Sequence, residues 1–233
     1  MELVKINPIW KYIPAFSGAN IRTVDGIICA ENIITKNRND LSGSFLPSRY
    51  RIIMKISDLK KLETESLERG IPIIGSKKGF WLLEKIKKLK PKKILELGTA
   101  NGYSGIILGS ENGKLTTIEI DPKIAEEAKN NFKRFKIKNR IIVGEANKEI
   151  LKLKEKFDII FIDHTKKGYI KVLENCIKLL NENGVIIADN INFEGCFDFK
   201  KMVLNHPNLE TEIINIEDGL SFSREKQRKE ILS

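Results

Sequence analysis

The chain has 233 residues, of which 41% are hydrophobic, and 41 lysines and arginines against 31 aspartates and glutamates give it a formal net charge of +10. This length supports one α/β domain with some elaboration and leaves no room for a second catalytic domain. No apolar run approaches the roughly 20 residues of a membrane span, and the first residues lack a signal-peptide core, so we expect a cytoplasmic protein without a membrane partner.

Residues 1–65 are expected to form an N-terminal extension that is partly strand-like. Two apolar stretches, 21–24 and 27–30, flank Asp25-Gly26, which predicts a β-hairpin. A further strand is expected over 49–56, and a helix capped by Ser57 should follow it.

From residue 66 to residue 233, apolar strands alternate with amphipathic helices, which predicts one α/β domain with a doubly wound, mostly parallel sheet. We expect helices over 76–90, 103–108, 122–135, 148–153, 169–180 and 198–205. We expect seven strands, over 93–97, 115–120, 140–143, 157–162, 185–188, 210–216 and 220–223, the last two as an antiparallel pair.

The strand over 93–97 leads into a glycine-rich turn just before a helix, a place where nucleotide-type ligands bind. The glycine spacing is G-x-x-x-G-x-x-G, from Gly98 to Gly105, and differs from the G-x-G-x-x-G that suits a pyrophosphate. Glu96, at the end of this strand, suits a ligand with a cationic head. Glu119, at the end of the next strand, can bind a ribose diol. S-adenosylmethionine meets both requirements.

Oxygen ligands follow two further strands, Asp163 after one and Asp189 with Asn190 after the other. Ligands gather outside the carboxyl ends of the strands in an open α/β sheet, so we expect these side chains to converge beside the pocket. Two carboxylates and an amide oxygen form a site that suits Mg²⁺. The alternative is that each acid only caps the helix or turn that follows it.

Taken together, these features resemble the cation-dependent catechol-type O-methyltransferases, a family of class I S-adenosylmethionine-dependent enzymes with a Rossmann-like, seven-stranded sheet. The resemblance covers about residues 70–223. It is carried by six blocks in family order: Ile74-Gly75-Ser76-Lys77-Lys78-Gly79, Leu95-Glu96-Leu97-Gly98 through Gly102-Tyr103-Ser104, Thr117-Ile118-Glu119-Ile120-Asp121-Pro122, Ile162-Asp163-His164 with Lys166, Ala188-Asp189-Asn190, and Asp218-Gly219-Leu220.

The resemblance implies roles for individual positions. Cofactor contacts are implied for Ile74, Glu96, Gly98, Ala100, Tyr103, Ser104, Glu119, Ala146, Asn147 and Asp163, with Glu119 on the ribose and the loop of Ala146 and Asn147 beside the adenine. A divalent cation, Mg²⁺ first, is implied at Asp163, Asp189 and Asn190. Lys166 matches the catalytic lysine that takes the hydroxyl proton, and we expect His164 to pack beside the site.

The expected substrate is a small hydroxylated acceptor. The catechol branch has a glutamate directly after its Asp-Gly-Leu block, whereas this chain has Ser221, which argues against catechol itself. The alternative acceptor is RNA: the resemblance extends to a broader family in which relatives methylate a hydroxylated tRNA base, and a charge of +10 suits a phosphate backbone. The same charge also fits a composition typical of thermophiles. A binding module without catalysis is a third option, and the N-terminal extension is expected to cover the acceptor or to form a homodimer.

Overall fold

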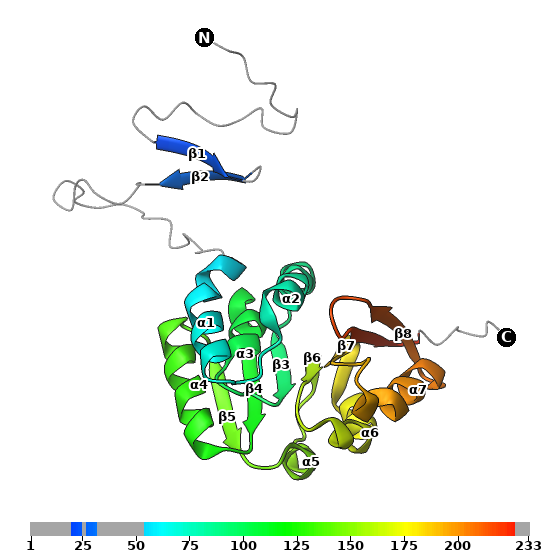
Figure 1. The fold of residues 1–233 in the computed structure, drawn as a ribbon. Coiled ribbons are helices and arrows are strands. Elements are labelled where there is room, and N and C mark those ends of the chain that lie inside the picture. The colour runs from blue at the N-terminus through cyan, green and yellow to red at the C-terminus, as the bar shows by residue number, and fades with distance from the viewer. Residues whose placement is uncertain (1–19, 25–26, 32–53, 227–233) are drawn as a thin grey trace, which may run out of the picture. The chain divides into compact units, whose positions relative to one another are not determined.

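The computed structural model describes residues 20–24, 27–31 and 54–226, and the chain divides into two compact units, 1–51 and 52–233 (Figure 1). In the first unit, β1 (Asn20–Val24) pairs antiparallel with β2 (Ile27–Glu31), which confirms the two strands of the expected hairpin. The turn at 25–26 and most of the strand expected over 49–56 lie outside the described residues. The described end of that stretch, from Ile56, begins a 3-10 helix instead.

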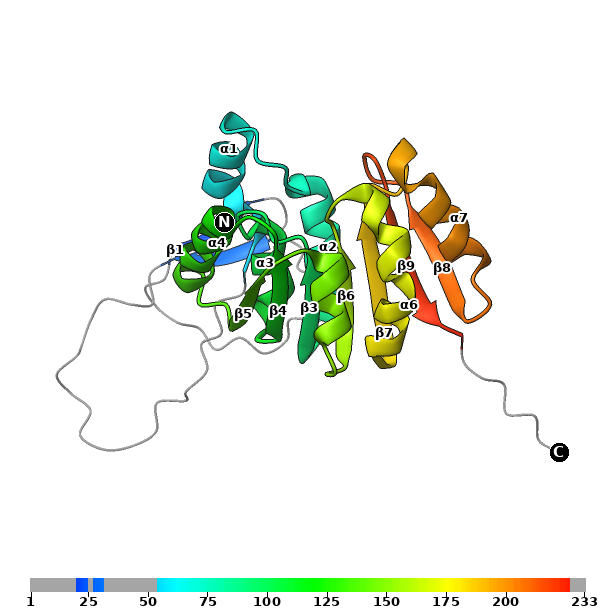
Figure 2. The ribbon, with the colours of Figure 1, turned by 90° about the horizontal axis from the view of Figure 1, so that it is seen from below.

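The second unit is built on a seven-stranded sheet. Its strands are β3 (Lys93–Leu97), β4 (Lys114–Glu119), β5 (Asn139–Val143), β6 (Phe157–Ile162), β7 (Leu180–Asp189), β8 (Leu209–Ile214) and β9 (Leu220–Glu225). Their order is β5-β4-β3-β6-β7-β9-β8, from left to right in Figure 2. β9 pairs antiparallel with both β7 and β8, and the other four pairings in the sheet are parallel. The sheet is therefore mostly parallel, which confirms the expected fold class.

Helices cover both faces of this sheet, with one hydrophobic core on each side. One face carries α1 (Lys60–Glu68), α2 (Gly75–Leu89), α3 (Tyr103–Leu108) and α4 (Pro122–Arg134), and the other carries α5 (Ala146–Glu149), α6 (Tyr169–Leu179) and α7 (Phe197–Asn205). Short 3-10 helices are η1 (Ile56–Leu59), η2 (Gly109–Glu111), η3 (Ile150–Lys152), η4 (Lys166–Gly168) and η5 (Glu194–Cys196). None of the helices that the structure describes is long and apolar enough to cross a membrane.

Local sequence explains most of these elements. β6 is apolar apart from Asp158 because a central parallel strand is covered on both faces. α4 begins where the Asp121 side chain accepts backbone N–H bonds from Lys123 and Ile124, with Pro122 in the first turn. Leu62 of α1 packs in the same core as α2 and α3, so this helix belongs to the second unit although it precedes residue 66.

The order of the strands creates a switch point between β3 and β6. The chain goes from β3 outward to β4 and β5, then returns to the other side of β3 to form β6. The N–H of Asp163, just after β6, donates to the carbonyl of Leu97 at 2.8 Å. Ligands of open α/β sheets bind at such a point, outside the carboxyl ends of the strands.

Candidate active site

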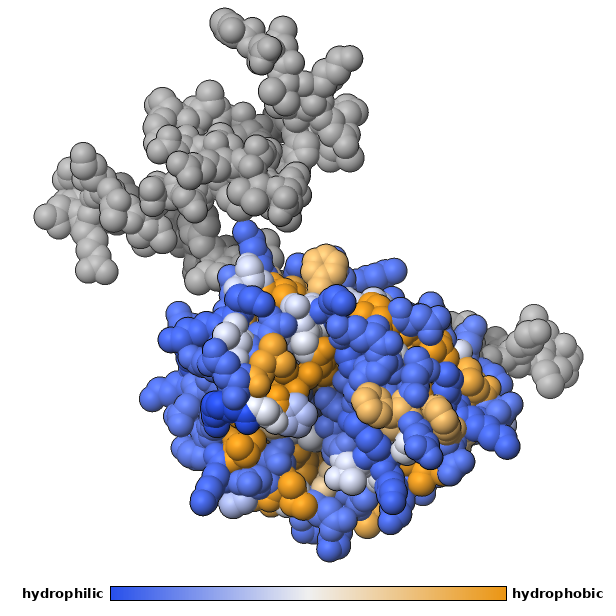
Figure 3. Space-filling view, in the orientation of Figure 1, coloured by the Kyte–Doolittle hydropathy of each residue, from blue (hydrophilic) through white to orange (hydrophobic). Residues whose placement is uncertain are grey.

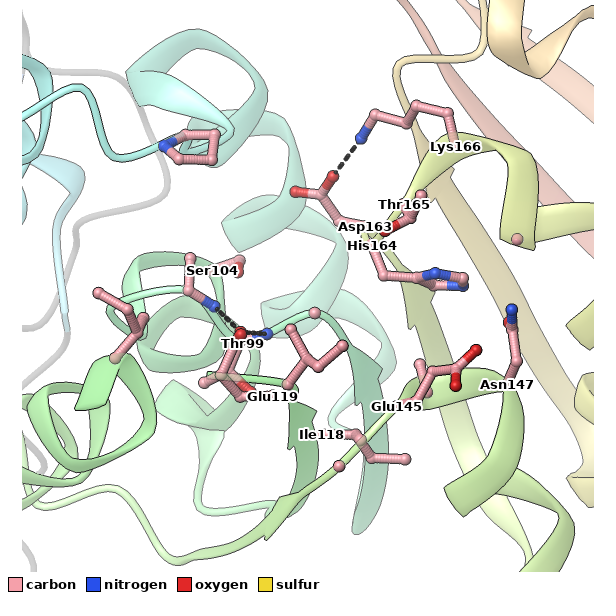
Figure 4. Close-up of a pocket in the computed structure, with 18 of the residues that line it drawn as sticks. Thr99, Ser104, Ile118, Glu119, Glu145, Asn147, Asp163, His164, Thr165 and Lys166 are labelled. Atoms are coloured by element: carbon pink, nitrogen blue, oxygen red, sulfur yellow. Dashed lines mark hydrogen bonds and ion pairs between the residues drawn. The ribbon is translucent and has the colours of Figure 1, made fainter. Parts of the chain in front are cut away.

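A pocket of about 780 Å³ lies at the carboxyl ends of the strands (Figure 4). The loops that follow β3, β4, β5 and β6 form its walls, and residues 70–73 before α2 add a further side. On the face shown in Figure 3, apolar side chains are exposed around a central hollow, while most of the surrounding surface is hydrophilic. The pocket therefore has the place that the strand order predicts for a ligand.

The turn after β3 approaches the end of β6 very closely. Gly98 has a φ of +98°, and a Cβ built on it would lie 2.1 Å from the carbonyl oxygen of Asp163. Only glycine fits this contact. The turn and the acidic end of β6 are thus held against one another, and both line the pocket.

Glu119 closes β4 on one side of the pocket, opposite Asp163 and Lys166 (Figure 4). Its carboxylate accepts backbone N–H bonds from Thr99 at 3.2 Å, Ala100 at 2.8 Å and Asp121 at 3.0 Å. Each carboxylate oxygen can accept more than one hydrogen bond, so the group is fixed in place and can still accept from a diol.

Glu96 has a different environment. The structure places it fully buried beside the turn, where Ser104 and Thr117 each donate a hydroxyl hydrogen bond to it at 2.6 Å, and it is not among the residues that line the pocket. Burial raises the pKa of Glu96 to about 8, against the lowering effect of the two hydroxyl bonds. The carboxyl group is therefore mostly neutral at neutral pH.

Asn147 and His164 lie near one another at the far side of the pocket (Figure 4). Asn147 Oδ1 and His164 Nε2 are buried and have no hydrogen-bond partner among the described residues. Burial, with the charge of Lys166 adding to it, lowers the pKa of His164 to about 4, so its ring is neutral near pH 7. Such unpaired polar atoms on a pocket wall are suited to a polar ligand.

Asp163, Lys166 and Tyr169 form a connected group at the end of β6. The Lys166 ammonium donates to Asp163 Oδ1 at 2.8 Å and lies 3.1 Å from the Tyr169 hydroxyl. Lys166 is half-buried and lines the pocket, so its amine is held over the carboxylate within reach of a bound molecule.

Asp189 ends β7, the strand next to β6, and Asn190 follows it. Ile162 and Ala188 are partners in the sheet, so Asp163 and Asp189 occupy equivalent positions on neighbouring strands. Burial raises the pKa of Asp189 to about 6, the negative charge of Asp163 adds to the effect, and Lys78 opposes it. Two carboxylates that repel each other in this way form a place where a cation is favoured.

The donor set fits a hard cation. Asp163, Asp189 and Asn190 offer only oxygen ligands at adjacent strand ends, which is the chemistry that Mg²⁺ accepts. The described residues hold no cluster of three or more His, Cys, Asp and Glu side chains arranged as a metal site, and this set contains only two such residues.

Lys78 and Asp218 were not among the site residues predicted from the sequence. The Lys78 ammonium is almost fully buried and donates to Asp189 Oδ1 at 2.6 Å and to Asp218 Oδ1 at 2.5 Å. Both residues fall inside blocks that carry the resemblance, but a buried lysine on an otherwise basic helix gives no local signal.

The other expected residues divide into two groups. Those that line the pocket are Gly98, Ala100, Tyr103, Ser104, Glu119, Ala146, Asn147, Asp163 and Lys166. Those outside its lining are Ile74, Glu96, Asp189 and Asn190. Ile74 is buried in the core just before α2. The segment 70–73 also lines the pocket and was not expected to do so.

Comparison with known proteins gives this site a family. A family model described as O-methyltransferase matches residues 53–226, which is most of the chain. The chain belongs to the O-methyltransferase family. Membership confirms the resemblance drawn from the sequence and the expected enzyme class, an S-adenosylmethionine-dependent O-methyltransferase.

Individual relatives agree with this O-methyltransferase assignment. Catechol O-methyltransferase B of Danio rerio is 31% identical over 170 residues, which are 64% of this chain and 64% of that protein. Catechol O-methyltransferase of Bos taurus is 29% identical over 208 residues, 79% of this chain and 75% of the other. The chain thus spans a little less than two thirds of the Danio rerio protein.

Solved structures share the fold. A Staphylococcus aureus protein assigned as a caffeoyl-CoA O-methyltransferase has a TM-score of 0.67 at 26% identity, over 74% of this chain and 93% of that one. The O-methyltransferase of Bacillus cereus in complex with SAH has a TM-score of 0.67 at 24% identity, over 75% and 93% of the two chains.

Proposed function

We propose that this O-methyltransferase transfers the methyl group of S-adenosylmethionine to a hydroxyl oxygen of a small acceptor, with the help of a divalent cation. The observation that carries the proposal is the position of Asp163. Its backbone touches Gly98 in the glycine-rich turn, its carboxylate accepts from Lys166, and its charge acts on Asp189. Groups suited to cofactor, cation and proton transfer therefore meet at one residue.

The pocket supports the cofactor assignment. Glu119 is held by three backbone N–H groups and can accept hydrogen bonds from the ribose diol. Asn147 and the neutral His164 offer unpaired polar atoms for the adenine ring. Tyr103 and Ser104, at the start of α3, line the side of the pocket assigned to the methionine moiety.

Asp163, Asp189 and Asn190 would hold the cation. When bound, a divalent cation supplies positive charge that stabilises an acceptor oxyanion. The uncharged amine of Lys166 takes the proton of the acceptor hydroxyl. Tyr169 and Asp163 hold the ammonium group that results. The acceptor oxygen then forms a bond to the methyl carbon while the sulfur–methyl bond breaks, and its electron pair stays on sulfur to give S-adenosylhomocysteine.

One observation favours a small acceptor over RNA, and a second one bears on which small acceptor is used. The basic run at 85–93 covers the last part of α2 and the start of β3. The start of β3 lies at the amino ends of the parallel strands, whereas the pocket lies at their carboxyl ends, and no residue of the run lines the pocket. Ser221, at the position of the catechol-branch glutamate, is buried in β9 opposite Ala188 and offers no carboxylate. We therefore expect an acceptor other than a catechol.

The test is incubation with labelled S-adenosylmethionine and a cell extract separated into RNA and small-molecule fractions. We expect label in the small-molecule fraction, loss of transfer with a chelator, and recovery with Mg²⁺ or Mn²⁺. Label confined to RNA would contradict the acceptor class. Full transfer in chelator would contradict the cation, and the absence of any transfer or cofactor binding would contradict the enzyme assignment.

A further inference from the structure

Asp218 lies at the carboxyl end of β7, where its carboxylate links Lys78 and Asn190. Its Oδ1 accepts from the buried Lys78 ammonium at 2.5 Å, and its Oδ2 accepts from Asn190 Nδ2 at 2.5 Å. The same ammonium donates to Asp189 Oδ1 at 2.6 Å. The backbone is fixed as well, because the N–H of Asn192 donates to the carbonyl of Asp218 at 2.9 Å. Asp218 is thus held directly against Asn190 and, through Lys78, next to Asp189.

The direction of these bonds decides how the Asn190 amide is turned. An ionised carboxylate has no hydrogen to donate, so the atom of Asn190 that faces Asp218 must be the amide nitrogen. The amide oxygen is then left on the other side of the same group. Hard cations are bound by the amide oxygen, and the amide nitrogen is not a ligand for them.

We infer that Asp218, held by Lys78, is a positioning residue that orients Asn190 so that its oxygen is presented to the cation. This inference rests on the proposed function, since it assumes that Asn190 is a cation ligand. Asp218 itself is not a ligand in this arrangement. It acts through the hydrogen bond that it accepts from Asn190.

The geometry predicts a specific failure in Asp218→Asn. Lys78 needs an oxygen acceptor, so the asparagine would turn its oxygen to Lys78 and its NH₂ group to Asn190. Asn190 would have to turn its own oxygen toward this new donor, and its nitrogen would then face the cation. Asp218→Ala removes the same charge but does not force this rotation.

A second substitution should reverse the failure. With aspartate at position 190, one oxygen can accept from the asparagine at 218 while the other remains for the cation. The double variant Asn190→Asp/Asp218→Asn should therefore regain binding. Glu217→Gln is the matched control, because it removes a carboxylate from the neighbouring residue, which pairs with Lys77 on the surface and does not contact Asn190.

The experiment is a titration of Mn²⁺ into the full chain, followed through the paramagnetic resonance signal of free Mn²⁺, so that no turnover is needed. We expect Asp218→Asn to weaken Mn²⁺ binding by about tenfold or more, Asp218→Ala by clearly less, and Glu217→Gln by less than about twofold. The double variant should return to within about threefold of wild type.

Equal weakening in Asp218→Asn and Asp218→Ala would show that only charge matters and would overturn the inference. A double variant no better than Asp218→Asn would do the same. If Asp218→Asn does not fold, the double variant should still bind Mn²⁺ more tightly than Asp218→Ala, and the reverse order would refute the role. A wild-type chain that binds no Mn²⁺ would remove the proposed cation, and the orienting role with it.

Discussion

Replacing Glu96 with glutamine tests whether a neutral carboxyl group lies beside the glycine-rich turn. The side chain is fully buried, and its pKa rises from 4.5 to about 8 because burial opposes the charge. Between these two values the folded chain keeps a proton that the unfolded chain releases, so stability falls as pH rises through this range. Each pH unit is worth about 1.4 kcal/mol, which gives a loss of about 3 kcal/mol between pH 4.5 and neutral pH.

Glutamine has the shape of the protonated acid and, like it, an acceptor oxygen on one side and a donor on the other. One of the Ser104 and Thr117 hydroxyls can therefore donate to it while the other accepts, without this pH dependence. Urea unfolding of both proteins from about pH 5 to about pH 8 should show the stability difference moving in favour of Glu96→Gln by roughly 1.4 kcal/mol per pH unit.

Glu126→Gln is the control for this experiment. Glu126 is an exposed glutamate that pairs with Lys129 on α4, so its replacement should leave the pH profile unchanged. A difference between Glu96→Gln and wild type that stays flat over this pH range would show that Glu96 is ionised in the folded chain and would refute the reasoning.

Two further predictions concern the pocket. Glu119→Ala should weaken S-adenosylmethionine binding by about 1.5–3 kcal/mol through loss of charge-assisted hydrogen bonds to the ribose, measured by calorimetry, and unchanged affinity would remove Glu119 from the cofactor site. Lys166→Ala should slow single-turnover methyl transfer by roughly 10²–10⁴-fold with little change in cofactor affinity. His164→Ala should cost much less, and a large loss there beside a near-normal Lys166→Ala would identify His164 as the base.

The central elements of the fold could be predicted because their sequence signals are local and strong. β3 and β6 have the expected bounds, since each is mainly apolar and lies in the interior of a parallel sheet. Predictions were weaker where polarity hides an element. β7 begins at Leu180, whereas the strand was expected to begin at residue 185. The prediction began too late because the first residues of β7, through Gly184, are mostly polar.

The face of a helix was harder to predict than its existence. Phe80 shares helical spacing with Leu83 and Ile86, yet it is 60% exposed while those two residues are buried, because Leu82 and Leu83 set the inward face of α2. Spacing alone does not fix which edge of an apolar stripe meets the core.

Several residues that line the pocket could be picked out from the sequence, but their hydrogen-bond partners and their burial could not. Strand ends located Glu119 and Asp163, and the family resemblance added Lys166; all three line the pocket. The pairing of Lys78 with Asp189 joins residues 111 positions apart, so no local pattern could reveal it. The burial of Glu96 likewise depends on the packing of α3 and β4 around it.

The contact between Gly98 and Asp163 has a consequence for how this enzyme can diversify. With no space for even a methyl group between the turn and the backbone at the end of β6, position 98 must stay glycine for as long as the two segments keep this contact. The segment 70–73 before α2, which also lines the pocket, can vary without disturbing that junction.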